Sequence, residues 1–198
     1  MSIPILILAA GSSRRMKGRD KLLMDVNGTT LLRHVVDRAV ATGHPVFVTL
    51  PKGNAARQTA LADMNVQIIE VSETDLGMAQ SLRAGLQVIS ADYAGLLVAL
   101  ADMPDITSDD YICLINSFGG DPKGDIQRAA SQGGTAGNPV LLPRWALNDL
   151  GELQGDAGAR HLFRRHANRV HLVPLPDDRA ITDLDTPADW AVWRDKTS

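Results

Sequence analysis

The sequence predicts an α/β fold in which helices cover both faces of a largely parallel sheet. Apolar runs of strand length alternate with segments of helical periodicity along most of the chain. The run Gly95–Leu100 is apolar throughout, which is typical of a strand at the centre of such a sheet. A length of 198 residues suits one α/β domain with a single sizeable core, so we expect one domain over residues 1–198.

Strands and helices are expected to alternate through the first part of the chain. The strands are expected over residues 3–8, 46–50, 66–71 and 95–100. The helices are expected over residues 30–41, 55–64, 77–89 and 108–118. The apolar side of the first helix consists of Leu31, Leu32, Val35, Val36, Ala39 and Val40.

Local signals predict where two of these helices begin, where one of them ends, and which face of a third is buried. Thr29 or Thr30 can cap the start of the first helix, and Gly43 can end it. Ser108 is expected to cap the helix over residues 108–118. In the helix over residues 77–89, the side chains expected to face inward are Met78, Leu82, Leu86 and Ile89.

The pattern is looser beyond residue 118. Strands are expected over residues 125–130, 139–142 and 170–174, and helices over residues 144–150, 157–166 and 187 to about 194. Pro187 suits a first helical turn, with Thr186 as its cap. The glycine-rich segment 132–138 is expected to be either a disordered hairpin tip or a mobile substrate loop.

Composition and charge exclude several function classes. The net charge of −3 gives no support to broad nucleic-acid binding, and no apolar run approaches the ~20 residues that span a bilayer. The first apolar run is too short for a signal peptide and follows no basic segment, so we expect a cytoplasmic location. The single cysteine, Cys113, excludes an internal disulfide, and its apolar neighbours indicate a small core residue.

A small, glycine-containing, strongly basic loop follows the first expected strand directly. It reads Ala9-Ala10-Gly11-Ser12-Ser13-Arg14-Arg15-Met16-Lys17-Gly18-Arg19-Asp20-Lys21. Small residues let backbone N–H groups approach phosphate oxygens, and the cationic side chains offset phosphate charge. The loop is neither a Walker A sequence nor a dinucleotide fingerprint, because it lacks both Gly-Lys-Ser/Thr and Gly-x-Gly-x-x-Gly. It predicts binding of a nucleoside triphosphate, and the alternative is a basic surface turn.

Aspartates at two places are candidate ligands of a divalent metal. Asp102 follows the expected strand 95–100, at the carboxyl end where open α/β sheets bind ligands. Its carboxylate suits a Mg²⁺ that bridges phosphates, whereas the alternative is a capping or turn aspartate. Asp183 and Asp185 fall on the same side of an extended segment. We assign Asp185 as the second ligand with Asp183 as the alternative, and Asp189 can serve the helix dipole alone.

The basic loop resembles a family signature. The pattern Leu-Ala-Ala-Gly-x-Ser-x-Arg-Met, here residues 8–16 with Gly18 and Lys21 after it, is similar to that of the molybdenum cofactor nucleotidyltransferases. These are the cytidylyltransferases and guanylyltransferases of the MobA-like NTP transferase type. The chain has Lys17 where that family has glycine, so its loop is one residue longer. Further similar motifs follow in the family's order, and the resemblance extends from residue 3 to about residue 193.

The resemblance implies a fold and a reaction. The fold is a three-layer Rossmann-like α/β sandwich of the nucleotide-diphospho-sugar transferase type. The reaction is Mg²⁺-dependent transfer of CMP from CTP to molybdenum-loaded molybdopterin, with release of pyrophosphate and delivery of the product to a molybdoenzyme or its maturation chaperone. Family guanylyltransferases have Gly-Gly where this chain has Ala10-Gly11, which favours CTP. The alternatives are GMP transfer from GTP, cytidylyl transfer to a sugar or polyol phosphate, and a non-catalytic cofactor-binding chaperone.

The resemblance also implies roles for individual residues. Arg15 would hold the β and γ phosphates, Lys21 would stabilise charge at the α phosphate, and Asp102 and Asp185 would hold Mg²⁺. The other residues implied in nucleotide binding are Ala9, Ala10, Gly11, Ser12, Ser13, Gly77 and Ser81. Those implied at the anionic acceptor are Asp156 and Arg160, beside a Gly137-Asn138-Pro139 step in which asparagine replaces the family's histidine.

Overall fold

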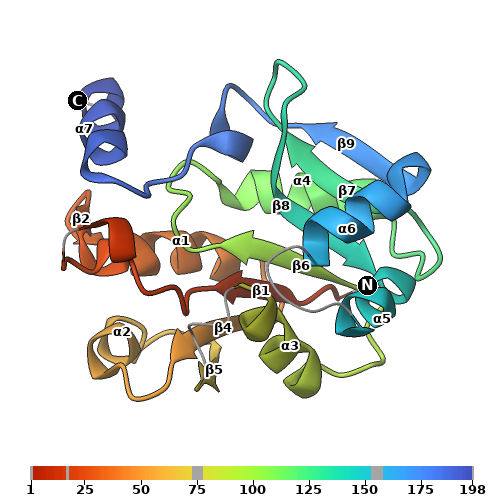
Figure 1. The fold of residues 1–198 in the computed structure, drawn as a ribbon, viewed down its shortest axis with the longest axis horizontal. Coiled ribbons are helices and arrows are strands. Elements are labelled where there is room, and N and C mark those ends of the chain that lie inside the picture. Colours follow the sequence, from red (N-terminus) through yellow and green to blue (C-terminus); the bar gives the residue numbers. More distant parts are fainter. Residues whose placement is uncertain (1, 17, 73–77, 153–157, 198) are drawn as a thin grey trace.

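A seven-stranded sheet forms the centre of the computed structural model, with the strand order β5-β4-β1-β6-β8-β7-β9 (Figure 1). The structure describes residues 2–16, 18–72, 78–152 and 158–197. The strands of this sheet are β1 (Ile5–Leu8), β4 (Val46–Pro51), β5 (Gln67–Val71), β6 (Gly95–Leu100), β7 (Ile126–Ala130), β8 (Ala136–Pro143) and β9 (Val170–Pro174). Two short strands, β2 (Asp25–Val26) and β3 (Thr29–Thr30), form a separate antiparallel ribbon.

The direction of the strands decides which chain segments meet at each edge of the sheet. β5, β4, β1 and β6 pair in parallel, and β7 pairs in parallel with β9. β8 lies between β6 and β7 and is antiparallel to both. The carboxyl ends of β1 and β6 therefore share one edge with the start of β8. The expected α/β class with a mostly parallel sheet is confirmed, and β6 is its central strand.

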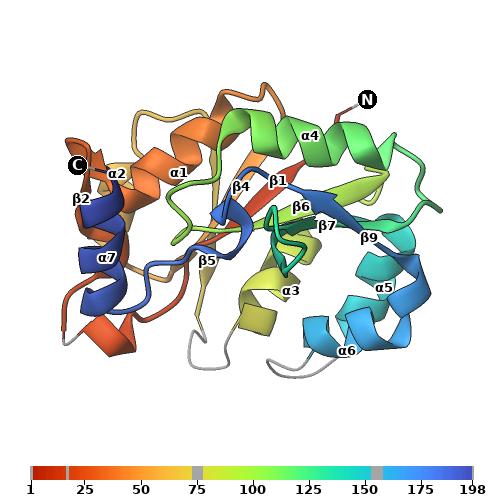
Figure 2. The same ribbon diagram turned by 90° about the horizontal axis from the view of Figure 1, so that it is seen from above.

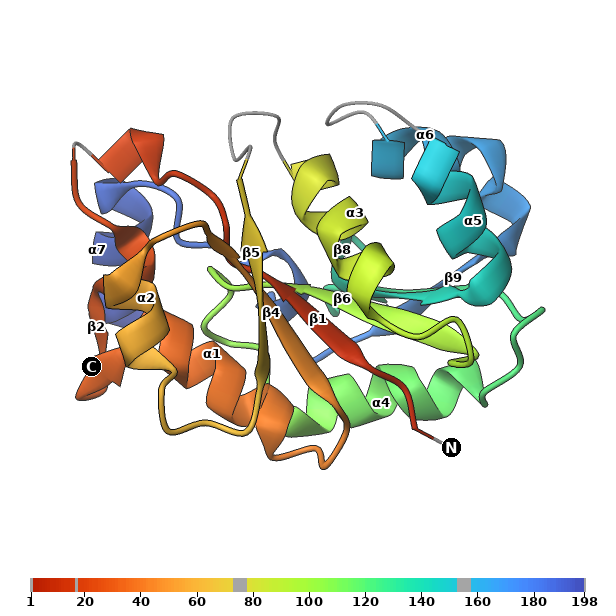
Figure 3. The ribbon, with the colours of Figure 1, turned by 90° about the horizontal axis from the view of Figure 1, so that it is seen from below.

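Helices cover both faces of the sheet, as expected. They are α1 (Leu31–Val40), α2 (Ala55–Ala60), α3 (Met78–Val88), α4 (Ser108–Phe118), α5 (Arg144–Glu152), α6 (Gly158–Arg165) and α7 (Pro187–Thr197). Figures 2 and 3 show α1 and α4 on one face and α3, α5 and α6 on the other. Among the described residues, no helix combines the length and apolarity needed to cross a bilayer.

The two faces of β1 supply two separate cores. Ile5 and Ile7 belong to a buried cluster that includes residues of α1, α4 and α7, whereas Leu6 belongs to a cluster that includes residues of α5 and α6. This alternation follows from the two-residue side-chain period of a strand. Because β1 is buried on both sides, it holds the loop that follows it on a rigid base.

Three of the four side chains expected to face inward from the segment 77–89 do so, because Ile89 is buried and Leu82 and Leu86 pack partly buried against the same core. Met78 was expected to face inward, but 55% of it is exposed. The most buried positions of α3 are Ser81 and Gly85. A Cβ atom on Gly85 would collide with the side chain of Leu6, so the helix contacts the strand through a residue without a side chain. Apolar periodicity cannot reveal such a contact.

Several element boundaries agree with the sequence, and some details differ. α4 and β9 have the predicted bounds, and Thr30 caps α1 by accepting a hydrogen bond from Arg33 N. α2 ends at Ala60 rather than at residue 64, because the chain closes into hydrogen-bonded turns. Thr107, not Ser108, caps α4, since its hydroxyl accepts from Asp110 N.

Two further predictions are wrong, the second only in part. Cys113 is exposed on α4 rather than a core residue. The segment 132–138 was expected to be a disordered hairpin tip or a mobile substrate loop; it does connect β7 and β8 as a hairpin, but it is hydrogen-bonded rather than disordered. Ser131 N donates to Thr135 O and Gly134 N to Ser131 O, which closes a tight turn, and β8 starts directly afterwards at Ala136.

Candidate functional site

Three chain segments meet at the edge of the sheet where β1 and β6 end. Leu8 and Leu100, the last residues of these strands, are register partners, so the basic loop and Asp102 begin at neighbouring points. The third segment precedes α7, and it is fixed here because the N–H of Leu184 donates a 3.0 Å hydrogen bond to the carbonyl oxygen of Asp102. Residues from both ends of the chain thus meet at one place.

Three carboxylates gather where these segments meet. Asp102, Asp183 and Asp185 each offer one oxygen, and these three oxygens lie within 4.8 Å of one another. Loss of solvation, together with the negative charges of Asp102 and Asp185, raises the pKa of Asp183. The repulsion indicates that the cluster is suited to a cation.

Lys21 lies between two of these carboxylates. Its Nζ atom is 2.6 Å from Asp102 Oδ2 and 2.6 Å from Asp185 Oδ1. Burial disfavours the charged amine, but the charges and hydrogen bonds of the two aspartates outweigh burial, so the pKa of Lys21 lies above its ordinary value. The ammonium group therefore stays charged in a mostly buried position, at the junction of the basic loop and the acidic cluster.

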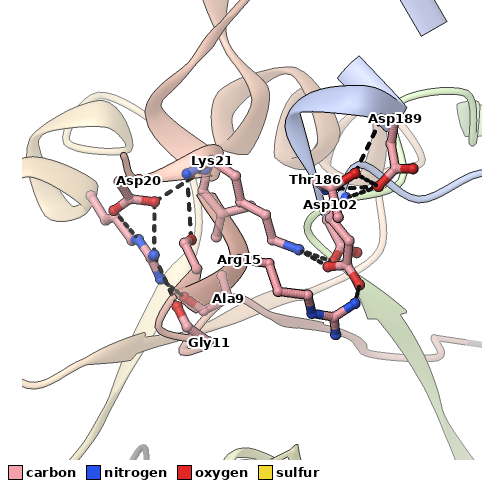
Figure 4. Close-up of polar contacts among 12 residues, drawn as sticks. Ala9, Gly11, Arg15, Asp20, Lys21, Asp102, Thr186 and Asp189 are labelled. Carbon is pink, nitrogen blue, oxygen red and sulfur yellow. Dashed lines mark hydrogen bonds and ion pairs between the residues drawn. The ribbon is translucent and has the colours of Figure 1, made fainter. Parts of the chain in front are cut away.

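Arg15 reaches the same cluster from the solvent side. Its guanidinium lies 2.8 Å from Asp185 Oδ2, although 71% of the arginine side chain is exposed. Figure 4 shows the side chains of Arg15 and Lys21 both directed toward Asp102 and the segment before α7. Asp189 is not part of this cluster: its carboxylate accepts hydrogen bonds from Thr186 N and Asp185 N, which confirms a capping role for Thr186 and Asp189.

The donor set fits a divalent metal ion. Asp102 Oδ1 is buried and has no hydrogen-bond partner among the described residues, although its other oxygen binds Lys21. An unpaired buried carboxylate oxygen is costly unless a cation or water completes it. Carboxylate oxygens from Asp102 and either Asp183 or Asp185 are ligands that hard divalent cations prefer.

The backbone of the basic loop presents hydrogen-bond donors. Within the described residues, the N–H groups of residues 10–13 donate no hydrogen bond, whereas Ala9 N donates to Thr49 O at 3.1 Å. Ser13 has a positive φ of 51°, which turns the chain sharply after these donors. Met16, only 2% exposed, anchors the far side of the loop in the core. The loop is thus held at both ends with its donors unpaired, as anion binding requires.

The remaining predicted site residues are not all brought together. Ser81 is buried on α3, outside the acidic cluster. Gly77 and Asp156 lie outside the described residues, and Arg160 belongs to α6, where only its backbone is described. Gly137 and Asn138 start β8 at the same edge as Asp102, as the antiparallel direction of β8 requires.

Two arginines were missed by sequence reasoning. Arg57, in α2, is 2% exposed and contacts the start of the basic loop. Arg128, in β7, lies in a cross-strand row with the apolar residues Val98 and Val140. Neither residue belongs to a recognisable motif. The one available signal was a charged residue at position 128, within a segment that was expected to be a strand beside apolar strands.

Arg128 has the surroundings of an anion-binding residue. Its guanidinium stacks over the ring of Phe163 at 4.6 Å, and its Nε donates to the carbonyl oxygen of Gly137 at 3.0 Å. Loss of solvation lowers the pKa of Arg128. In the described part of the chain no carboxylate forms an ion pair with this side chain, which leaves a half-buried cation available to an anionic ligand.

Comparison with known proteins identifies the family. The model of the MobA-like NTP transferase domain matches residues 5–170, which include β1, the basic loop and β6. The chain belongs to the MobA-like NTP transferase family. It is therefore a nucleotidyltransferase, and the family resemblance of the basic loop is confirmed.

Individual relatives agree with this assignment. A molybdenum cofactor guanylyltransferase of Shewanella putrefaciens is 30% identical over 175 residues, which cover 87% of this chain and 85% of that protein. The crystal structure of an Rv0371c homologue from Mycobacterium sp. strain JC1 superposes with a TM-score of 0.85 and 27% identity, covering 98% of this chain and 96% of that one. Rv0371c of Mycobacterium tuberculosis in complex with manganese gives a TM-score of 0.80 at 25% identity, with 97% of both chains covered. These superpositions also confirm the expected fold, the α/β sandwich of the nucleotide-diphospho-sugar transferase type.

Proposed function

We propose that this MobA-like transferase moves CMP from CTP to molybdopterin, with pyrophosphate as the leaving group. The observation that carries the proposal is the position of Lys21, which contacts Asp102 and Asp185 at the end of a loop with unpaired N–H donors. In this arrangement the cationic groups can neutralise phosphate charge and the carboxylates can hold a metal ion, and phosphoryl transfer requires both. The name of the relatives, molybdenum cofactor guanylyltransferase, supports molybdopterin as the acceptor.

Positioning and charge neutralisation carry the reaction in this proposal. The N–H groups of Ala10 to Ser13 donate to oxygens of the triphosphate. Arg15, which is exposed, binds the β and γ phosphates, and Lys21 stabilises the charge that develops at the α phosphate. The acceptor is a phosphate monoester and already anionic, so it attacks the α phosphorus in line without needing a strong base.

A divalent metal belongs to the proposed site. Asp102 and Asp185 would hold Mg²⁺, and the bound ion would neutralise phosphate charge. The unpaired Oδ1 of Asp102 and the manganese complex of Rv0371c support a metal here. Asp183 is the alternative second ligand, because its carboxylate belongs to the same cluster.

Two candidates remain for the donor nucleotide, CTP and GTP, which differ in their base. Ala10 is almost completely buried, and its methyl group occupies space that the Gly-Gly of family guanylyltransferases leaves free, which favours CTP. The relatives are named guanylyltransferases, which favours GTP, so GMP transfer to the same acceptor is the second candidate.

The acceptor side of the site rests on other residues. We assign Asp156 and Arg160 to the anionic acceptor by their likeness to the family motif. Arg128 supports an anionic acceptor independently, because its half-buried guanidinium has no acid partner among the described residues. Asn138, at the same edge as Asp102, takes the place of the family's histidine.

Pyrophosphate release tests the function directly. The protein is incubated with Mg²⁺ and molybdenum-loaded molybdopterin, and CTP, GTP, ATP and UTP are compared. Release with CTP alone supports the proposal as stated, and release with GTP alone replaces the donor and keeps the mechanism. No release with any of them, from protein that binds a nucleotide, rejects molybdopterin as acceptor and favours first a sugar or polyol phosphate and second a non-catalytic cofactor-binding chaperone.

A further inference from the structure

Arg57 lies in an unusual position for a charged residue. It belongs to α2, where its backbone N–H donates to the side chain of Asn54 at the helix cap. Only 2% of the residue is exposed. A buried guanidinium is costly unless its donors are all directed at acceptors. The partners of Arg57 come from two separate parts of the basic loop.

The first partners are backbone carbonyls at the start of the loop. Arg57 Nη1 donates to the carbonyl oxygen of Ala9 at 2.6 Å, and Nη2 donates to that of Gly11 at 3.0 Å. In a planar trans peptide the C=O and the next N–H point in opposite directions. Because these two carbonyls are directed at Arg57, the N–H groups of Ala10 and Ser12 are directed away from it. These are two of the unpaired donors of the loop.

The second partner is the carboxylate that precedes Lys21. Arg57 Nε lies 2.8 Å from Asp20 Oδ2, and Nη2 lies 2.8 Å from Asp20 Oδ1. Asp20 also caps the short helix Lys21–Leu23 by accepting from Leu22 N at 3.1 Å. Figure 4 shows Asp20, Ala9 and Gly11 together on one side of Lys21, with Asp102 on the other. One guanidinium therefore joins the two ends of the loop.

We propose that Arg57 is a positioning residue that orients the loop for the triphosphate of a nucleotide. It fixes the outward direction of the Ala10 and Ser12 N–H groups, and through Asp20 it fixes the start of the helix that carries Lys21. The identity of the ligand rests on the proposed function, whereas the orientation of the loop does not.

The test compares Arg57→Lys and Arg57→Met with a matched control, Arg33→Met. Arg33 also pairs with both oxygens of one aspartate, Asp63, and donates to a backbone carbonyl, but its partners lie outside the loop. Lysine keeps the charge of Arg57 but cannot span two carbonyls and a carboxylate. We expect Arg57→Lys to weaken nucleotide binding by about tenfold or more, measured by calorimetry without acceptor. The KM for nucleotide should rise while the KM for acceptor stays unchanged, and Arg33→Met should bind normally.

A double variant separates orientation from stability. Asp20→Asn with Arg57→Met removes both charges, so it should regain thermal stability relative to Arg57→Met alone but should not regain nucleotide affinity. Recovery of affinity along with stability would overturn the positioning role, as would wild-type affinity in a folded Arg57→Lys.

Hydrogen exchange separates failure of this inference from failure of the proposed function. The amides of Ala10 and Ser12 can be followed by NMR in the nucleotide-free protein. Their exchange rates and chemical shifts should change in Arg57→Lys and not in Arg33→Met, even if the wild type transfers nothing to molybdopterin. Unchanged amide signals in Arg57→Lys would reject the inference whatever the activity.

Discussion

Gly137 lies directly against the backbone carbonyl of Ala180, with no room for a side chain between them. This contact presses the start of β8 against the short helix Arg179–Ile181 (η5), which leads into the acidic segment 183–185. The spacing of two chain segments beside the site therefore depends on a missing Cβ atom.

Gly137→Ala is expected to destabilise the protein by about 1–3 kcal/mol, because backbone must shift to admit the methyl group. A chain of this length should then lose about 2–4 °C in Tm for each kcal/mol. Gly133→Ala is the control, since the nearest atom to a Cβ there is 3.8 Å away. Calorimetric unfolding of both variants checks the prediction, which equal Tm values would contradict.

Asp102→Ala is expected to abolish turnover and leave the fold intact, because it removes a carboxylate that contacts Lys21 and that offers an unpaired oxygen. Asp105→Ala is a suitable control in the same turn, where the carboxylate accepts a 2.8 Å bond from Trp193 Nε1 instead. Pyrophosphate release and circular dichroism are measured for both. If Asp102→Ala kept more than about a tenth of the wild-type rate, a loss of only ~1.4 kcal/mol, the metal role would be wrong.

The two acids before α7 can be separated by their dependence on metal. Asp185→Asn should raise the Mg²⁺ concentration needed for half-maximal activity far more than Asp183→Asn, because Asp185 is the proposed second ligand and Asp183 the alternative. Mn²⁺ titration by calorimetry gives a readout independent of turnover. A larger effect from Asp183→Asn in both measurements would exchange the roles of the two residues.

Ala10→Gly should shift donor preference toward GTP, because it removes the buried methyl group that distinguishes this loop from Gly-Gly. The measurement is the ratio of kcat/KM for CTP and GTP in wild type and variant. If the wild type already uses GTP as well as CTP, the size argument at position 10 fails.

Arg128→Met should raise the KM for the acceptor by about tenfold and leave the KM for nucleotide unchanged, since it removes a half-buried cation and keeps its length. Arg169→Met is a matched control, because Arg169 also stacks on an aromatic ring, at 4.1 Å from Trp145, but is already paired with Asp125. Equal acceptor KM values for the two variants would remove Arg128 from the acceptor site.

Much of the fold could be predicted because its signals are local. β6 is apolar along its whole length and α4 has consistent helical spacing, so both have the predicted bounds. The inner face of α3 was predicted only in part: Leu82 and Leu86 pack against the core, but Gly85 makes its tight contact with Leu6 without any side chain that could signal it. The turn before β8 was misjudged because most of its hydrogen bonds join backbone atoms, which composition does not report.

The site residues divide in the same way, into those that their neighbours in the sequence signal and those that only the fold brings together. The basic loop and Asp102 each follow a buried strand, and this context is visible in the sequence. The contact of Lys21 with Asp185 joins residues far apart in the chain, and only the fold reveals it. Arg57 lies in a short helix with no motif, and its function comes entirely from the acceptors that surround it.

The same long-range contact has a consequence for synthesis of the protein. Lys21 and Asp185 are separated by 164 positions, so a ribosome completes β1, β6 and most of the sheet before the second carboxylate exists. A nascent chain that has emerged as far as β9 carries the loop, Lys21 and Asp102 but lacks the acids before α7. The acidic cluster therefore cannot assemble until the segment before α7 has been synthesised, and a chain released before that point carries the basic loop without its complete set of acids.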